Sequence, residues 1–351
     1  MQSRGWVMHS VGEPLSPYQW ELPELARNEV VVEIHGCGLC HTDLGYLYDG
    51  VPIRSELPLV LGHEIVGVVV ETGEDSSGWQ GKAVIIPAVI PCGDCSPCSR
   101  GKPGICSKQI FPGNDIHGGF ASHIVVPSRG LCEVPPSSDS NLALYSVIAD
   151  AVTTPLNAVE RSGLSEGDVA VFVGVGGLGI FGAQIARAYG ANVIVLDVDD
   201  EKLEKARAIG FEHALNVQGV EARALKKQLR SLATENRWPK AEWKIFETSG
   251  TAPGQEIAYA LLNFGAALMV VGYTTDEIKI RLSNLMAFEA RAEGVWGCPP
   301  SRYPKALELV QSGKVQLEPF VEVRPMNEIN EILTAAHAGN LKKRVVMTPN
   351  S

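Results

Sequence analysis

The chain has 351 residues, of which 45% are hydrophobic and 20% charged, an ordinary globular balance with enough length for two domains. Its net charge of −10 argues against nucleic acid or an anionic membrane surface as the main partner. The first ten residues contain no apolar run typical of a signal peptide, and the eight cysteines are mostly clustered, so we expect metal thiolates in a reducing, cytoplasmic setting.

The first part of the chain, up to about residue 148, has the pattern of strands and turns. Residues 30–34, 65–70 and 83–86 are short apolar runs rich in β-branched residues, and proline and glycine separate them. Two potential metal ligands, Cys40 and His63, lie here beside glycines. A single Cys or His is more often a packed core residue than a ligand, but a position in a turn favours the ligand interpretation.

Four cysteines with the spacing C-x2-C-x2-C-x7-C follow in a Gly/Pro-rich loop, residues 91–107. Four soft thiolates on one short lobe suit a closed tetrahedral zinc site that holds a loop with little core of its own. Disulfides are the alternative, although thiols spaced by two residues pair awkwardly, and an iron–sulfur cluster is another. These cysteines are Cys92, Cys95, Cys98 and Cys106.

A single acid, Asp150, lies within the apolar segment 148–154, where the strand-rich part of the chain ends. An unpaired carboxylate among apolar residues is costly, so we expect a metal or another cation beside it. Together with Cys40 and His63 it would supply three ligands and leave a fourth position open, as catalytic zinc sites do.

The segment 169–197 has the pattern of a dinucleotide-binding unit. A buried strand at 169–173 runs into G-x-G-G-x-G, and a helix at 180–189 and a second strand at 192–196 follow. The first glycine permits the tight turn, the second lets the backbone approach a pyrophosphate, and the last lets helix and strand pack closely. A glycine-rich turn without a ligand is the alternative; a membrane span over 169–186 is disfavoured by the glycines. The glycines are Gly174, Gly176, Gly177 and Gly179.

Asp197 ends the second of these strands and indicates which dinucleotide binds. A carboxylate about twenty residues past the glycines accepts hydrogen bonds from the adenosine ribose hydroxyls. The 2′-phosphate of NADP would meet like charge there, and no arginine follows in Val198 or Asp199. We therefore predict NAD as the cofactor.

Strands and helices alternate to residue 297, which predicts a parallel sheet with helices on both faces, a doubly wound α/β domain. Two more helices and a last strand would then complete the first domain. We predict that the first domain consists of residues 1–149 and is completed by residues 298–351. The dinucleotide domain would consist of residues 150–297. The predicted elements are helices at 200–209, 221–235, 254–262, 303–312 and 327–338 and strands at 243–246, 267–271 and 344–347.

Taken together, these motifs resemble the zinc-dependent medium-chain dehydrogenase/reductase family of the alcohol dehydrogenase type, over essentially the whole chain. The resemblance implies a GroES-like catalytic domain beside the Rossmann domain, a structural and a catalytic zinc, and NAD. It implies that Cys40, His63 and Asp150 bind the catalytic zinc, and that Glu64 is the acid that can approach this metal. Thr42 would take the proton of the substrate hydroxyl.

The resemblance also assigns residues around the metal and the cofactor. Asp43 corresponds to the acid that orients the histidine ligand. One position departs from the family, because Gly45 stands where many members carry a histidine at the outer end of a proton relay. Cofactor contacts are implied for His41, Thr154, Val271, Gly272 and Arg344.

Five segments, 81–93, 112–115, 118–123, 281–288 and 296–300, resemble the branch of the family that oxidises a ring hydroxyl of a cyclohexene-carbonyl-CoA thioester. Since the chain is net negative, a local basic rim would have to dock the CoA phosphates. Loop positions make Arg54, Lys108 and Arg302 candidates, although each residue taken singly is better explained as a solvated surface charge. The resemblance also leads us to expect a homo-oligomer, a dimer or a tetramer.

Two other functions remain open from the sequence. One is a dehydrogenase of the same family that acts on another secondary alcohol or a polyol. The other is a non-catalytic NAD-binding protein, which the complete set of three predicted catalytic ligands argues against.

Overall fold

The computed structural model describes residues 1–136 and 141–349. The chain forms two compact units. The first consists of Met1–Thr153, Gly297–Glu308 and Leu317–Ser351, and the second of Thr154–Trp296 and Leu309–Gln316. The predicted boundaries after residues 149 and 297 differ from these. The first unit continues to Thr153, includes Gly297, and leaves Leu309–Gln316 to the second unit.

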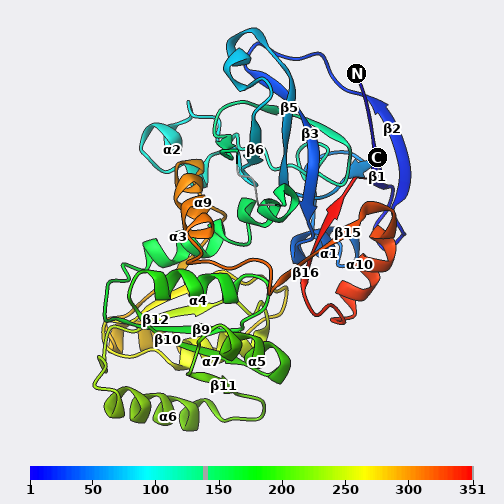
Figure 1. The fold of residues 1–351 in the computed structure, drawn as a ribbon. Helices are drawn as coiled ribbons and strands as arrows, with labels where there is room; N and C mark the ends of the chain where they lie inside the picture. Colours follow the sequence, from blue (N-terminus) through cyan, green and yellow to red (C-terminus); the bar gives the residue numbers. More distant parts are fainter. Residues whose placement is uncertain (137–140, 350–351) are drawn as a thin grey trace. The chain divides into compact units, whose positions relative to one another are not determined.

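The first unit is built on a sheet with the strand order β15-β16-β3-β5-β6-β8, in which β7 also pairs with β3 (Figure 1). Its central strand β3 is rich in valine, and most of its side chains are buried on both faces. A smaller sheet has the order β2-β1-β4. The strands of this unit are β1 (Gln2–Met8), β2 (Ser16–Glu21), β3 (Glu29–Gly38), β4 (Leu59–Val60), β5 (Glu64–Thr72), β6 (Ala83–Ile86), β7 (His123–Pro127), β8 (Cys132–Glu133), β15 (Val321–Pro325) and β16 (Arg344–Thr348).

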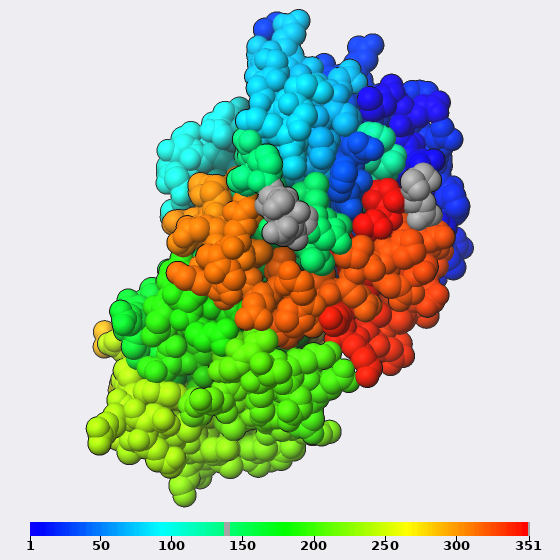
Figure 2. Space-filling model, viewed as in Figure 1, coloured from blue at the N-terminus to red at the C-terminus, as the bar shows by residue number. Residues whose placement is uncertain are grey.

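The C-terminal part of the chain completes this sheet, as predicted. Strand β16 pairs antiparallel with β3. The side-chain amide of Asn330 both donates to and accepts from the backbone of Leu15, which ties a C-terminal helix to the N-terminal strands. This helix, α10, is orange-red beside the blue N-terminal strands in Figures 1 and 2. Helices that begin in the first unit are α1 (His41–Leu47), η1 (Glu74–Trp79), α2 (Ser96–Ser99), η2 (Pro103–Ile105), η3 (Leu142–Ala149), η4 (Pro300–Arg302), α9 (Tyr303–Gln311), η5 (Met326–Glu328) and α10 (Ile329–His337), where η marks a 3₁₀ helix.

The second unit is a parallel sheet with the strand order β11-β10-β9-β12-β13-β14. The order reverses direction at β9, so right-handed crossovers put α4 and α7 on opposite faces (Figure 1). This is the doubly wound fold that the alternation predicted. Its elements are α3 (Thr153–Arg161), β9 (Val169–Val173), α4 (Gly179–Ala188), β10 (Asn192–Asp197), α5 (Asp200–Ala208), β11 (Ala214–Asn216), α6 (Ala222–Glu235), β12 (Lys244–Glu247), α7 (Ala252–Ala260), β13 (Ala267–Val270), α8 (Ser283–Ala287) and β14 (Arg291–Gly294).

Over residues 1–136 and 141–349, no single helix has the length and apolar composition needed to cross a membrane. One bent pair of helices, Leu142–Ala149 with Thr153–Arg161, meets the length and composition criteria jointly.

Candidate active site

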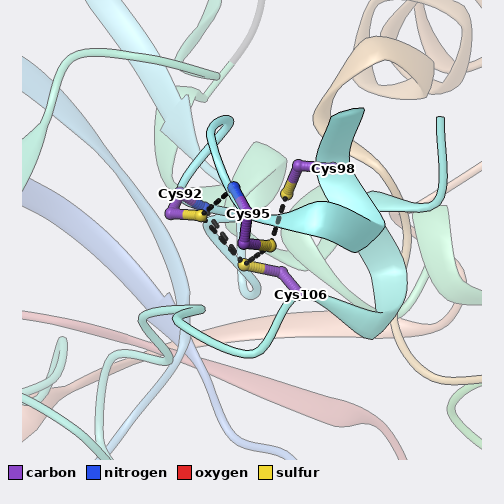
Figure 3. A group of neighbouring side chains, drawn as sticks. All are labelled: Cys92, Cys95, Cys98 and Cys106. Atoms are coloured by element: carbon purple, nitrogen blue, oxygen red, sulfur yellow. Dashed lines mark hydrogen bonds between the residues drawn. The ribbon is translucent and has the colours of Figure 1, made fainter. Parts of the chain in front are cut away.

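The four cysteines of the 91–107 lobe converge on one point, with all four Sγ atoms within 4.8 Å of one another (Figure 3). The Sγ atom of Cys95 lies 3.5 Å from that of Cys98 and 3.6 Å from that of Cys106. These separations are far longer than a disulfide bond of roughly 2.05 Å. They are close to the separation of about 3.8 Å that a tetrahedral zinc with Zn–S bonds of about 2.3 Å imposes. The geometry therefore fits a closed zinc site.

Backbone N–H groups of the lobe point at the same sulfur atoms. The N–H of Cys95 donates to the Sγ of Cys92, and those of Cys92 and Lys108 donate to the Sγ of Cys106, each at 3.3 Å. Hydrogen bonds from the backbone, that of Cys98 first, lower the pKa of Cys95 to about 6, whereas a hydrogen bond with the Asp94 carboxylate raises the pKa of Cys92 to about 12. The backbone donors favour thiolates, which are the metal-binding form of cysteine.

A second cluster brings together three residues far apart in the sequence. The Oδ2 atom of Asp150 lies 3.7 Å from the Sγ of Cys40 and 3.7 Å from the Nε2 of His63. All three ligand atoms are within 4.8 Å of one another. One sulfur, one imidazole nitrogen and one carboxylate oxygen at these separations fit a three-ligand zinc site with an open fourth position.

Local structure explains how these side chains are presented. Cys40 is the residue that caps the N-terminus of α1. His63 immediately precedes β5, and Asp150 follows η3 with irregular backbone angles (φ −139°, ψ −55°). Each ligand thus sits at an end of a regular element, where the side chain can turn away from the element's own packing.

Asp43 holds two of these ligand segments at once. Its carboxylate accepts the N–H of Cys40 at 2.9 Å, which completes a capping box, and the N–H of Gly62 at 3.1 Å. Its Oδ1 also lies 3.4 Å from the Nδ1 of His63. Among the described residues no acceptor forms a well-aligned hydrogen bond with this Nδ1. Asp43 therefore faces Nδ1 of the His63 ring, while Nε2 points at Asp150. A histidine that binds a metal through Nε2 typically has such an acid beside Nδ1.

The cluster carries excess negative charge in a buried setting. Burial alone would lower the pKa of His63, but the charges of Asp43 and Cys40 outweigh burial and raise that pKa well above its ordinary value. The carboxylates of Asp43 and Asp150 and the thiol of Cys40 lie around the His63 ring, so the pocket favours positive charge. This is the charge that a divalent metal would supply.

Glu64, the acid next to His63, lies outside the group of clustered ligand atoms. It forms a bidentate ion pair with Arg344, in which Nε donates to Oε2 at 2.9 Å, and its Oε1 also accepts the N–H of Ala151 at 3.0 Å. Burial raises the pKa of Glu64 to about 7, although Arg344 opposes this shift. Gly38 is required beside it, because a Cβ there would lie 2.0 Å from Oε2.

Comparison with known proteins places this geometry in a family. The alcohol dehydrogenase GroES-like domain family matches residues 26–136, and the zinc-binding dehydrogenase family matches residues 177–312. An alcohol dehydrogenase of Geobacillus stearothermophilus is 30% identical over 347 residues, covering 97% of this chain and 98% of the relative. The chain belongs to the zinc-type alcohol dehydrogenase family.

Other members differ in the alcohol that their names specify. A sorbitol dehydrogenase of Halalkalibacterium halodurans is 28% identical over 338 residues, 93% of each chain. The solved structure of the alcohol dehydrogenase from Aeropyrum pernix matches with a TM-score of 0.87 and 29% identity, covering 99% of this chain and 100% of that one. Family membership confirms three predictions. These are the fold class, the activity as an oxidoreductase acting on CH–OH groups, and the cofactors, zinc and a nicotinamide dinucleotide.

The second unit holds the glycine turn of this dehydrogenase. Gly174 has φ +91°, and a Cβ there would lie 2.6 Å from the Cα of Ser249. A Cβ on Gly179 would lie 1.9 Å from the carbonyl oxygen of Gly174. Gly176, by contrast, has open space at its Cβ position, and Gly177 is exposed. The turn is thus tightly packed on its inner side and open where a pyrophosphate would approach.

Asp197 ends β10 beside this turn, as predicted. Its carboxylate accepts the N–H groups of Val175 at 2.8 Å, Val198 at 2.8 Å and Asp199 at 3.1 Å. A carboxylate offers about four acceptor positions, so capacity remains for a ribose hydroxyl. The bond to Val175, which ties the acid to the glycine turn itself, has no signal in the sequence.

The other predicted cofactor residues lie in both units. Val271 and Gly272 follow β13 and donate their N–H groups to the carbonyl of Glu247. Thr154 is buried in α3, and His41 is exposed at the first position of α1. Their contacts with the cofactor stay predictions.

The three candidate basic residues for CoA differ in their surroundings. The guanidinium of Arg54 donates to Asn114 and, at 2.7 Å, to Asp115, so its charge is already paired. The amine of Lys108 is exposed and lies 3.9 Å from Asp94. Arg302 ends the short η4 helix and is exposed.

Two residues near the metal cluster were missed from the sequence. The ring of Phe111 packs on that of His63 with centroids 4.9 Å apart. Tyr303 bonds the carbonyl of Ala149, the residue before Asp150. Neither has a local signal, because each acts across a long sequence separation.

Proposed function

We propose that this chain is an NAD- and zinc-dependent dehydrogenase that oxidises the ring hydroxyl of 6-hydroxycyclohex-1-ene-1-carbonyl-CoA to the 6-oxo product. This reaction belongs to anaerobic degradation of aromatic compounds through benzoyl-CoA. The alcohol oxidation rests on the family and on one observation, the three ligand atoms of Cys40, His63 and Asp150 within 4.8 Å of one another. The choice of substrate rests on the resemblance of five sequence segments.

Within this proposal each side chain has a defined task. When zinc and NAD are bound, they supply a Lewis acid that lowers the pKa of the substrate hydroxyl and an acceptor for hydride. Thr42, whose Oγ1 lies 3.7 Å from the Sγ of Cys40, accepts the hydroxyl proton. Asp43 keeps Cys40 and His63 in place. Since Gly45 carries no side chain, the proton would pass from Thr42 to water, and the ribose of a bound NAD would offer a further hydroxyl on that route.

The preference for NAD is supported by Asp197. Its carboxylate is held in position by three backbone N–H groups, and it would repel the 2′-phosphate of NADP. The reducing cytoplasm suits the eight free thiols, four of which form the metal lobe.

One of the five segments that carry the resemblance, 112–115, lies in a loop next to the predicted metal ligands. Phe111 of this loop packs on His63, and Asn114 and Asp115 bind the side chain of Arg54. A loop that contacts a metal ligand can shape the substrate pocket. Arg54 is paired with Asp115, so the tests below use Lys108 and Arg302, whose side chains are exposed.

The second candidate is oxidation of a polyol or simple secondary alcohol, which the alcohol and sorbitol dehydrogenases among the relatives favour. NAD reduction should be measured with the CoA thioester, with cyclohex-2-enol and with sorbitol. We expect kcat/KM to be highest for the thioester. Equal or higher efficiency with either free alcohol would replace the CoA proposal with the second candidate.

Charge reversal tests the docking of the CoA moiety. Lys108→Glu and Arg302→Glu should raise KM for the thioester, more strongly at low salt, and leave KM for NAD unchanged. Arg27→Glu, at an exposed ion pair with Glu74 and Asp75, is the control. If both reversals behave like the control, the CoA moiety docks elsewhere.

We also propose a homo-oligomer, with the edge of the second unit as its interface. Strand β14 pairs only with β13 among the described strands. Leu282 and Met286, which are 68% and 78% exposed, lie between these two strands in the sequence. Exposed strand edges and exposed apolar side chains are both common at sites of association between copies. Light scattering should show a dimer or larger, and Met286→Glu should reduce its mass.

A further inference from the structure

Tyr303, the first residue of α9, is fully buried in the first unit and bonds two distant backbone segments. Its hydroxyl donates to the carbonyl of Ala149 at 2.5 Å and accepts the N–H of Ala88 at 3.1 Å. Burial raises the pKa of Tyr303 well above its ordinary value, so the hydroxyl keeps its proton and remains a donor.

The carbonyl that Tyr303 binds belongs to the peptide group directly before Asp150. The hydroxyl of Thr153 donates to the same carbonyl at 3.0 Å. On the other side of Asp150, the N–H of Ala151 donates to Glu64 at 3.0 Å. Both peptide groups that flank Asp150 are therefore held by side chains from other elements.

These bonds matter because the backbone at Asp150 is irregular. Helix η3 ends at Ala149, and the angles at Asp150 are those of no regular element. A carboxylate on such a backbone can keep a fixed distance from other groups only if the surrounding peptides are anchored. With both flanking peptide groups held, the carboxylate of Asp150 lies 3.7 Å from Cys40 and 3.7 Å from His63.

We propose that Tyr303 is a positioning residue for the metal ligand Asp150, acting through the carbonyl of Ala149 while Ala88 fixes the orientation of its hydroxyl. The inference rests on the proposed metal site and goes beyond its three ligands. Groups that orient metal ligands typically change metal affinity 10–100-fold when they are removed. Tyr303→Phe keeps the ring in the core and removes only the hydroxyl.

The experiment compares Tyr303→Phe with Tyr259→Phe in the full chain. Tyr259 is a matched control, since it is buried in the second unit and its hydroxyl donates to the carbonyl of Arg281 at 2.8 Å. Zinc per chain is measured by elemental analysis during titration with a chelator. The absorption spectrum of cobalt-loaded protein reports the geometry of the three-ligand site.

We expect Tyr303→Phe to lose one of its two zinc ions at a free-chelator concentration about 10–100-fold lower than the concentration that removes it from wild type. The absorption spectrum of cobalt-loaded Tyr303→Phe should also differ from that of wild type. The zinc of the four-cysteine lobe should be retained, and Tyr259→Phe should match wild type in both readouts. Thr153→Ala, which removes the other donor to the same carbonyl, should shift zinc loss in the same direction by a smaller factor. If Tyr303→Phe does not fold, the zinc affinity of Thr153→Ala tests the proposal instead.

A lower melting temperature of Tyr303→Phe with unchanged zinc affinity and cobalt spectrum would show a purely structural role and overturn the proposal. If Tyr303→Phe does not fold, unchanged zinc affinity in Thr153→Ala overturns it instead. Wild-type protein with a single zinc in the four-cysteine lobe would refute the metal site of the proposed function, and this inference with it. The number of zinc ions per wild-type chain therefore distinguishes failure of the proposed metal site from failure of the positioning role of Tyr303.

Discussion

Replacing Asp43 with asparagine should loosen the zinc held by Cys40 and His63 without disturbing the four-cysteine lobe. The carboxylate of Asp43 is completely buried and accepts two N–H groups, those of Cys40 and Gly62. Asparagine has one acceptor oxygen, so one of these buried N–H groups loses its partner. The charge facing His63 is lost as well.

The expected magnitude follows from these contacts. One unsatisfied buried N–H costs about 1–3 kcal/mol of folding free energy, so Asp43→Asn should lower stability by that amount. Asp43→Ala leaves both N–H groups unpaired and should cost about 2–6 kcal/mol, a large share of a typical total of about 5–15 kcal/mol. Metal affinity should fall about 10–100-fold, or about 1.4–2.7 kcal/mol.

The assay is zinc content by elemental analysis during dialysis against increasing chelator, combined with thermal unfolding. Wild type should hold two zinc ions per chain, and Asp43→Asn should lose the catalytic one first. Asp197→Asn is the control, because this buried acid also accepts backbone N–H groups but lies in the second unit. If Asp43→Asn retains both zinc ions as tightly as the control does, Asp43 does not orient the metal ligands.

Three further changes test other parts of the site. Thr42→Ala should lower kcat about 10²–10⁴-fold in steady-state assays while Thr42→Ser stays near wild type, and a fully active alanine variant would mean that another group takes the proton. Asp197→Ser should narrow the ratio of kcat/KM for NAD over NADP, and an unchanged ratio would remove Asp197 from cofactor selection. Burial raises the pKa of Glu247 in the folded state above its value of about 4.3 in the unfolded state. Protonated Glu247 therefore contributes its full stabilisation below about pH 4.3, and this stabilisation is lost as the pH rises through the folded-state pKa. Glu247→Gln should therefore reduce the fall in melting temperature between pH 5 and pH 8. If wild type and Glu247→Gln show the same dependence of melting temperature on pH, ionisation of buried Glu247 does not destabilise the fold.

Features specified by residues close in sequence were predicted well. Strand β9, the glycine turn and β10 follow from a continuous apolar run, turn glycines and a terminal acid, all within 29 residues. The four-cysteine lobe spans only Cys92 to Cys106, so spacing alone indicated convergence. Strands β11 and β14 were missed because they are short edge strands, which need neither β-branched residues nor two apolar faces.

What the sequence by itself determined were thus the periodic elements, the two metal-binding residue sets as candidates, and the acid that ends β10. Only the tertiary structure decided how distant segments meet. Asp150 lies 110 residues from Cys40, Arg344 lies 280 residues from Glu64, and Tyr303 lies 154 residues from Ala149, yet each pair is in contact. The sequence indicated Arg344 as a cofactor residue, and the fold pairs it with Glu64. Periodicity reports which face of an element is buried, but not which other element covers that face. Contacts between a helix start, a loop and a strand end depend on sheet order and crossovers, which appear only when the chain has folded.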